Sequence, residues 1–436
     1  MRPPSPARPP PASRGPLIAI LLAVVAAVGV AVAAFVLTRS TSNTTSSGTA
    51  GSSTAGSSAG APAVASTVVA SASTVVASTP AATRPRGSTA FGVLDNTDAV
   101  QTPDQFWGDY AALHMRAYRA DALWNVIAPT QPANALDPND PAYQWGYLDT
   151  IVRAAGAHGA MRNMIITVWR TPQWATQYGG KYTSVEALRI KSMPKPALYA
   201  EFAHAIATRY SGSFVPAGST EPLPAVHKWQ VWNEPNTYLV PWKVDGVSVV
   251  ARNYASLLNA GYASFKAVSP RNVVSNGGFG PSGQHQPELA PFTFVRALAK
   301  LGPRLDALSV HAYGANPGLG LRDGAGEGTQ APDLAPGNLK AWIAVADRAF
   351  GRKYRLWVTE FGWQTAPEDP QIGVSHADQA ADMKGMFDLL RSTKRVDIGI
   401  WFLMRDEPDV GAGWQSGVRT APGEEKPSYA VWSANG

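Results

Sequence analysis

From residue 89 onward, short apolar runs rich in β-branched and aromatic residues alternate with stretches whose apolar positions recur every three to four residues. The first pattern is typical of buried strands and the second of helices. The apolar runs predict strands at 90–95, 118–127, 163–169, 228–234, 272–277, 306–313, 355–361 and 396–404. The helical spacing is clearest in Leu198, Phe202, Ile206 and Tyr210, in Tyr254, Leu257, Leu258, Gly261, Tyr262 and Phe265, and in Met383, Met386, Phe387 and Leu390.

This alternation of strands and helices predicts an α/β fold with a parallel sheet, and eight such units match the (β/α)₈ or TIM barrel. A doubly wound open sheet is the alternative, but it would more often carry a glycine-rich turn after the first strand, and FGVLDNTD leads to no GxGxxG. We interpret the glycines at 314–328 as part of a loop. Long insertions follow four predicted strands, at 173–194, 236–249, 280–289 and 314–335. Loops in these positions line the C-terminal face of a barrel, where its active site lies.

The chain before residue 89 has a different character. Leu17 to Leu37 is a 21-residue run without a charge, which as a helix would span about 32 Å, close to the roughly 30 Å hydrocarbon thickness of a bilayer. We interpret 17–38 as a transmembrane signal anchor. A cleaved secretory signal is the alternative, favoured by the small residues Ala31-Val32-Ala33.

The flanks of this segment suggest an orientation. Three Arg precede it and one follows closely, which places the tail at 1–16 in the cytoplasm and the rest of the chain outside. Residues 39–88 consist largely of Ser, Thr, Ala, Gly and Val, a composition that predicts a disordered linker. The sequence therefore predicts a single-pass plasma-membrane protein with its folded domain, 89–436, outside the cell. The domain would be secreted if the segment is cleaved.

Charge and composition exclude several classes of function. The net charge of +6 arises from six Arg in the first 88 residues, which hold no Lys, Asp or Glu, so the folded domain is formally neutral. This argues against a nucleic-acid partner. The absence of Cys excludes disulfides, thiolate metal sites and a cysteine nucleophile. The seven His show no HxxxH or HExxH spacing and there is no GxSxG, so we predict no metal, no cofactor and no serine hydrolase.

Two glutamates end two of the predicted strands. Glu234 lies in Trp-Asn-Glu-Pro-Asn at the end of the fourth strand, and Glu360 lies in Thr-Glu-Phe-Gly-Trp at the end of the seventh. A buried ion pair would explain one such residue, but two at one barrel rim favour a shared site. Glycoside hydrolysis needs such a pair, one carboxyl protonated and the other ionised, about 5–5.5 Å apart for retention and about 6.5–9.5 Å apart for inversion.

The two motifs resemble those of the large clan of (β/α)₈ retaining glycosidases. Within it the chain is most similar to family 39 and its exopolysaccharide-hydrolase relatives, with family 5 next. The resemblance covers 89–436 and implies that Glu234 is the acid/base and Glu360 the nucleophile.

The same resemblance implies roles for other residues. Asn233 would bond the 2-OH of the substrate, and Arg119 would steady the nucleophile, although a surface arginine is an equal alternative. His311 and Tyr313 match the clan's position beside the nucleophile, with a core role as the alternative. Trp401 resembles the clan's aromatic residue that lies beneath the cleaved sugar. Trp169 resembles the clan's segment at the end of the third strand. Trp363, like these two, lies at a strand end and is a candidate for stacking on sugar.

The resulting hypothesis is a retaining glycoside hydrolase that acts on a polysaccharide or oligosaccharide. We expect the pKa of Glu234 to be raised above its ordinary value, to about 6, while the nucleophile is charged. One rival is a surface carbohydrate-binding barrel without catalysis, and another is a transglycosylase that uses the same glutamates. The sequence does not predict the sugar, the linkage or the oligomeric state.

Overall fold

A computed structural model describes residues 89–436, apart from 179–190, 284–285, 314–332, 371 and 411–412. The predicted tail, anchor and linker at 1–16, 17–38 and 39–88 lie outside the described residues. So do large parts of the predicted insertions at 173–194 and 314–335. No helix among the described residues is both long and apolar enough to cross a membrane.

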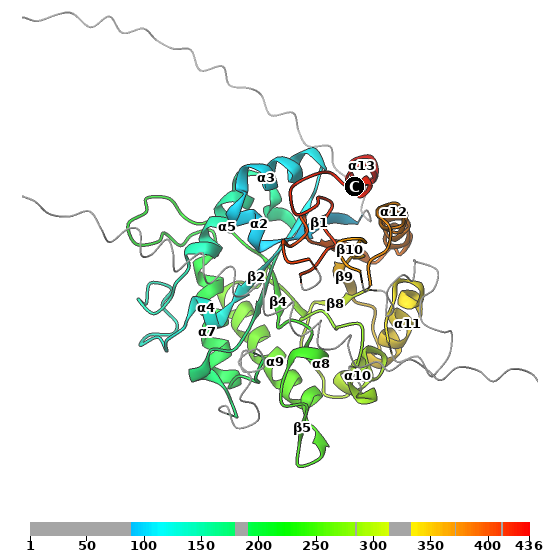
Figure 1. The fold of residues 1–436 in the computed structure, drawn as a ribbon. Helices are drawn as coiled ribbons and strands as arrows, with labels where there is room; N and C mark the ends of the chain where they lie inside the picture. The colour runs from blue at the N-terminus through cyan, green and yellow to red at the C-terminus, as the bar shows by residue number, and fades with distance from the viewer. Residues whose placement is uncertain (1–88, 179–190, 284–285, 314–332, 371, 411–412) are drawn as a thin grey trace, which may run out of the picture.

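The chain forms a closed barrel of eight parallel strands surrounded by helices (Figure 1). Around the barrel the strands follow the order β1, β2, β3, β4, β7, β8, β9, β10 and back to β1. Their bounds are Ala90–Leu94 (β1), Ala117–Leu123 (β2), Met164–Trp169 (β3), Lys228–Val231 (β4), Val273–Asn276 (β7), Ala307–His311 (β8), Arg355–Phe361 (β9) and Val396–Phe402 (β10). This arrangement confirms the predicted TIM barrel and excludes the open sheet.

The helices lie outside the strands, and a small hairpin extends from the loop after β4. The helices are Asn96–Gln101 (α2), Pro103–Ala112 (α3), Trp124–Ile127 (α4), Gly146–Ala157 (α5), Pro196–Arg209 (α7), Pro235–Tyr238 (α8), Val250–Val268 (α9), Pro291–Ala299 (α10), Leu339–Phe350 (α11), His376–Ser392 (α12) and Pro427–Asn435 (α13). The hairpin pairs Lys243–Val244 (β5) with Val247–Ser248 (β6). The three helices expected from apolar spacing are α7, α9 and α12.

Every predicted strand is present, with differences at the ends. The strand predicted at 118–127 ends at Leu123, and the last four residues form α4. There the Trp124 ring stacks on Phe202 of α7, with centroids 5.2 Å apart. The sequence does not indicate this change, because a short apolar stretch does not distinguish a strand from a buried helical turn.

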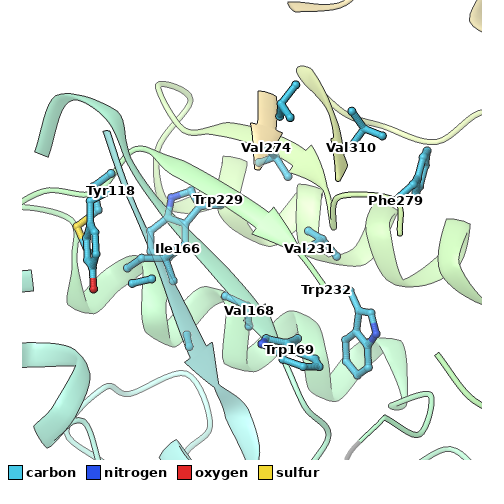
Figure 2. Close-up of a cluster of buried hydrophobic side chains, with 14 of the residues drawn as sticks. Tyr118, Ile166, Val168, Trp169, Trp229, Val231, Trp232, Val274, Phe279 and Val310 are labelled. Atoms are coloured by element: carbon cyan, nitrogen blue, oxygen red, sulfur yellow. The ribbon is translucent and has the colours of Figure 1, made fainter. Parts of the chain in front are cut away.

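Alternate residues of a strand face opposite sides of the barrel wall, except near the end of β9, where the register with β8 shifts by one residue. Those facing outward form the main hydrophobic core beneath the helices, and Figure 2 shows part of it, including Ile166, Val168, Trp229 and Val231. Apolar residues that face inward form a second, smaller cluster, most of it at the end of the barrel where the strands begin. It contains Ala90, Leu94, Ala117, Ile165, Ala307, Trp357, Ile398 and Ile400.

Above this cluster the barrel interior is polar. Arg119 and Thr167 follow Ala117 and Ile165 by two residues on the same faces, and they are joined by a bond from Nε to Oγ1 of 2.7 Å. Thr167 donates to Gln230 Oε1 (2.8 Å), and Gln230 donates to Thr359 Oγ1 (2.9 Å). All four side chains are fully buried, and we call them the polar layer. It lies directly below the strand ends that carry the two glutamates.

Candidate active site

The backbone after β4 turns sharply and brings Glu234 into the barrel mouth. Trp232 and Glu234 have φ values of 72° and 42°, in the left-handed region that side chains of this size rarely adopt. Each such residue costs on the order of 1–3 kcal/mol and persists only where its surroundings fix it. Here Trp232 N donates to Val168 O (3.0 Å) and Glu234 N donates to Gly277 O (2.8 Å).

Glu360 reaches the same place from β9. It is 8% exposed and Glu234 is 5% exposed. One carboxylate oxygen of each, together with a ring nitrogen of His311, lie within 4.8 Å of one another. The structure therefore brings together the two glutamates that the motifs singled out, at a separation suited to one reacting centre.

Arg119 holds the Glu360 side of this pair. Its guanidinium is fully buried and donates to Glu360 Oε1 (2.5 Å) and to Asn233 Oδ1 (2.7 Å). Thr167 of the polar layer accepts from the Arg119 Nε, so the charge is held in one position. The alternative of a surface arginine is excluded. The bond to Asn233 also orients that amide, and the contact of its Nδ2 group with a substrate hydroxyl stays a prediction.

His311 lies between the two carboxyls. Its Nδ1 is 2.7 Å from Glu234 Oε1 and 3.4 Å from Glu360 Oε2. Burial is the main cause that lowers the pKa of His311 to about 4, so the ring is neutral near pH 7. With carboxyls on one side only, we assign the proton to Nδ1, which donates to Glu234. Gly278, at φ +59°, permits this position because a Cβ there would lie 2.2 Å from His311 Nε2.

Tyr313 donates to Glu360 Oε2 (3.0 Å), and this bond favours the ionised carboxylate. The Tyr313→Phe variant is expected to lower kcat about 10- to 100-fold, because a hydrogen bond to a charged group contributes roughly 1.5–3 kcal/mol. It should also move the acidic limb of the pH profile to higher pH, since Glu360 loses a donor. Tyr354→Phe is the control, because Tyr354 lies just before β9, at the opposite end of the barrel. An unshifted acidic limb in Tyr313→Phe would contradict the role.

The two glutamates have different surroundings. Burial raises the pKa of Glu234 to about 8, against the charges of Arg119 and Lys191, which lower it. Burial also raises the pKa of Glu360, while the charge of Arg119 and its hydrogen bond oppose that rise. Glu360 accepts from a guanidinium and a hydroxyl, whereas Glu234 accepts from a neutral ring. The shared proton therefore resides on Glu234 and the charge on Glu360.

The same three side chains, Glu234, His311 and Glu360, also form a group that could hold a metal ion. Their contacts fit this poorly. Arg119 already binds Glu360 Oε1, and the His311 nitrogen that faces the carboxyls carries the proton it donates. The donor set is therefore better described as a proton-sharing cluster.

Two of the tryptophans expected to stack on sugar are placed elsewhere. Trp401 is fully buried, donates to Ser416 O (2.8 Å), and packs edge-on against Phe361 and Trp432. Trp363 packs against Trp401, with centroids 6.0 Å apart, in the outer core. The prediction that Trp401 lies beneath the cleaved sugar is wrong, because alternation along β10 turns it outward, toward α13.

The third candidate, Trp169, ends β3, the strand beside β4 and Glu234. Its ring lies 6.5 Å from that of Tyr238, at an interplanar angle of 27°, and the Arg170 guanidinium lies 4.7 Å from its centroid. Trp232, at which the chain turns toward Glu234, donates its backbone N–H to the carbonyl of Val168, the residue before Trp169 (both tryptophans are labelled in Figure 2). Its contact with a sugar stays a prediction.

The structure adds site residues that the motifs did not single out. Phe402, the neighbour of Trp401, turns inward, and its ring lies 6.4 Å from Tyr313 and 5.2 Å from Trp414. Phe402 and Trp414 are partly exposed and pack against Tyr313, the partner of Glu360. Ile398 and Ile400 of β10 face the barrel interior, and strict alternation along the strand would have indicated that Phe402 faces inward as well. Trp414 lies in a loop, and no pattern in the sequence pointed to it.

Comparison with known proteins supports the fold. No protein-family model and no curated protein match the chain. Similar solved structures include a family 39 glycoside hydrolase from Bacteroides cellulosilyticus WH2, at 18% identity and a TM-score of 0.55, covering 80% of this chain and 63% of that one. A glucosidase from Croceicoccus marinus is 15% identical with a TM-score of 0.57, covering 79% and 65%. GH5_18 from Streptomyces cattleya, in complex with GlcNAc, is 16% identical with a TM-score of 0.50, covering 80% of each chain.

The chain spans less than two thirds of the length of the first two of these structures. At such identities the likeness establishes a shared (β/α)₈ fold. Families 39 and 5, to which the motifs pointed, both occur among these structures, so the resemblance is confirmed at the level of the fold.

Proposed function

We propose that the chain is a retaining glycoside hydrolase that acts on a polysaccharide or oligosaccharide. The observation that carries the proposal is the pair Glu234 and Glu360, whose carboxylate oxygens approach within 4.8 Å at one barrel rim. This spacing suits a direct attack on the sugar and leaves less room than the roughly 6.5–9.5 Å that an inverting enzyme needs for its water.

The reaction has two displacements. In the first, a Glu360 carboxylate oxygen bonds to the anomeric carbon, the glycosidic C–O bond breaks, and the Glu234 proton passes to the leaving oxygen. In the second, Glu234 takes a proton from water, the water oxygen bonds to the anomeric carbon, and Glu360 leaves as a carboxylate. Once Glu360 is an ester its charge is lost, and Glu234 ionises more readily.

The stereochemistry of the first product tests this mechanism. A panel of aryl glycosides and defined oligosaccharides identifies a substrate, and NMR then follows the anomeric proton in the first minutes of hydrolysis. We expect the product to have the configuration of the substrate, because two inversions restore it. An inverted first product would exclude Glu360 as a nucleophile, and a chain that binds glycans without turnover would instead be the binding barrel.

Added acceptor sugars distinguish a hydrolase from a transglycosylase. Both use the same intermediate, and they differ in whether water or a sugar hydroxyl attacks it. Location outside the cell stays a prediction from residues 17–38, and cell fractionation tests it.

A further inference from the structure

Tyr238 is a part of the site that neither the motifs nor the mechanism has used. It follows Glu234 by four residues, at the end of α8, and its backbone N donates to Glu234 O (2.6 Å). Its position relative to the acid/base is therefore set by a single helical turn.

The Tyr238 ring is fixed on both sides. Lys191 Nζ lies 4.2 Å from its centroid, and the Trp169 ring lies 6.5 Å away. Lys191 is itself held through its backbone, where its carbonyl accepts from Val240 N (2.9 Å). A ring held in this way presents its hydroxyl in one direction.

The Tyr238 hydroxyl has no hydrogen-bond partner in the described part of the chain. Among the described residues, this hydroxyl is not one of the unpartnered polar atoms that are fully buried. The 2% of the Tyr238 surface that is exposed therefore includes the hydroxyl. Burial, and then the charges of Glu234 and Glu360, raise its pKa well above the usual value. The hydroxyl is therefore a neutral donor with no hydrogen-bond partner among the described residues.

On the basis of the proposed function, we propose that Tyr238 binds the sugar on the leaving-group side of the cleaved bond. The acid/base must touch the glycosidic oxygen, so the departing sugar lies on the Glu234 side. Tyr238 is on that side, whereas Tyr313, Phe402 and Trp414 lie with the nucleophile. A hydroxyl donor suits a sugar, whose oxygens are hydrogen-bond acceptors.

The test compares two substrates with the same first sugar, a 4-nitrophenyl glycoside and the corresponding disaccharide. In Tyr238→Phe, the ratio of kcat/KM on the disaccharide to that on the nitrophenyl glycoside should fall about tenfold, mainly through KM. Free monosaccharide can also act as the acceptor that attacks the glycosyl ester. The monosaccharide concentration at which this transfer is half-saturated should rise by a similar factor. Tyr262→Phe removes a hydroxyl from α9 that bonds Asp306 (3.1 Å) and is the control.

The outcomes are distinct. An equal loss on both substrates, or no loss on either, overturns the assignment of Tyr238 while the proposed function stands. If the unaltered protein cleaves neither substrate nor any member of the panel, the proposed function fails and this inference fails with it.

Discussion

Replacement of Glu360 with Gln is expected to lower kcat at least about 10⁴-fold, because the amide cannot form the glycosyl ester on which both displacements depend. Gln preserves the volume of the side chain and can still accept from Arg119, so the fold should be retained. The measurement is hydrolysis of the best substrate of the panel, with circular dichroism to verify folding. Glu425→Gln, which removes a surface carboxylate paired with Arg419, is the matched control.

Chemical rescue identifies the role of the residue. In Glu360→Ala, azide can occupy the vacated space, attack the anomeric carbon and displace nitrophenolate, giving a glycosyl azide of inverted configuration. Full activity in Glu360→Gln would refute the nucleophile assignment, and a retained azide product would transfer that role to another group.

Replacement of Glu234 with Ala is expected to slow cleavage of substrates with a sugar leaving group about 10²- to 10⁴-fold, since such a group cannot depart without a proton. A dinitrophenyl leaving group needs no proton, so its first displacement should be much less affected and the ester should accumulate. Azide should then attack that ester and give a product of retained configuration. Equal losses on both leaving groups would contradict the acid/base role.

The pH profile gives an independent reading of the same residue. Glu234 must be protonated to act as acid, and burial raises its pKa to about 8, so kcat/KM should fall as pH rises through about 8. Glu234→Ala should lose this basic limb. Glu407 is a second buried carboxyl, whose pKa is raised to about 7, and Glu407→Gln should keep the limb. If it does not, the limb belongs to Glu407.

The fold and the two glutamates could be predicted from local patterns. Each strand is an apolar run long enough to be recognised, and Glu234 and Glu360 each follow such a run directly. Strand parity decides which side chains of β10 face the interior, and there it selects Phe402. The motif alone favours Trp401, because a resemblance to a strand end carries no information on which way the side chain points. In β9 the parity changes at a register shift against β8, so that the consecutive residues Thr359 and Glu360 both face inward.

Other features depend on contacts between distant segments. Lys191 and Tyr238 meet only because the segments around Ser192 and Val240 pair in the fold. The pKa of Glu234 exceeds the expected value of about 6 because its carboxyl is deeply buried, and burial follows from packing that no single segment specifies. Thr167 and Gln230 are ordinary polar residues in their strands until the barrel closes and joins them to Arg119.

The polar layer also has a consequence for attempts to make the protein more robust. Filling a barrel interior with aliphatic side chains is a common route to higher thermal stability, and Thr167 and Gln230 are natural targets for it. Here such changes would release the guanidinium that holds the nucleophile, so gains in melting temperature would come with a loss of turnover. Stabilising substitutions belong on the outer helices instead.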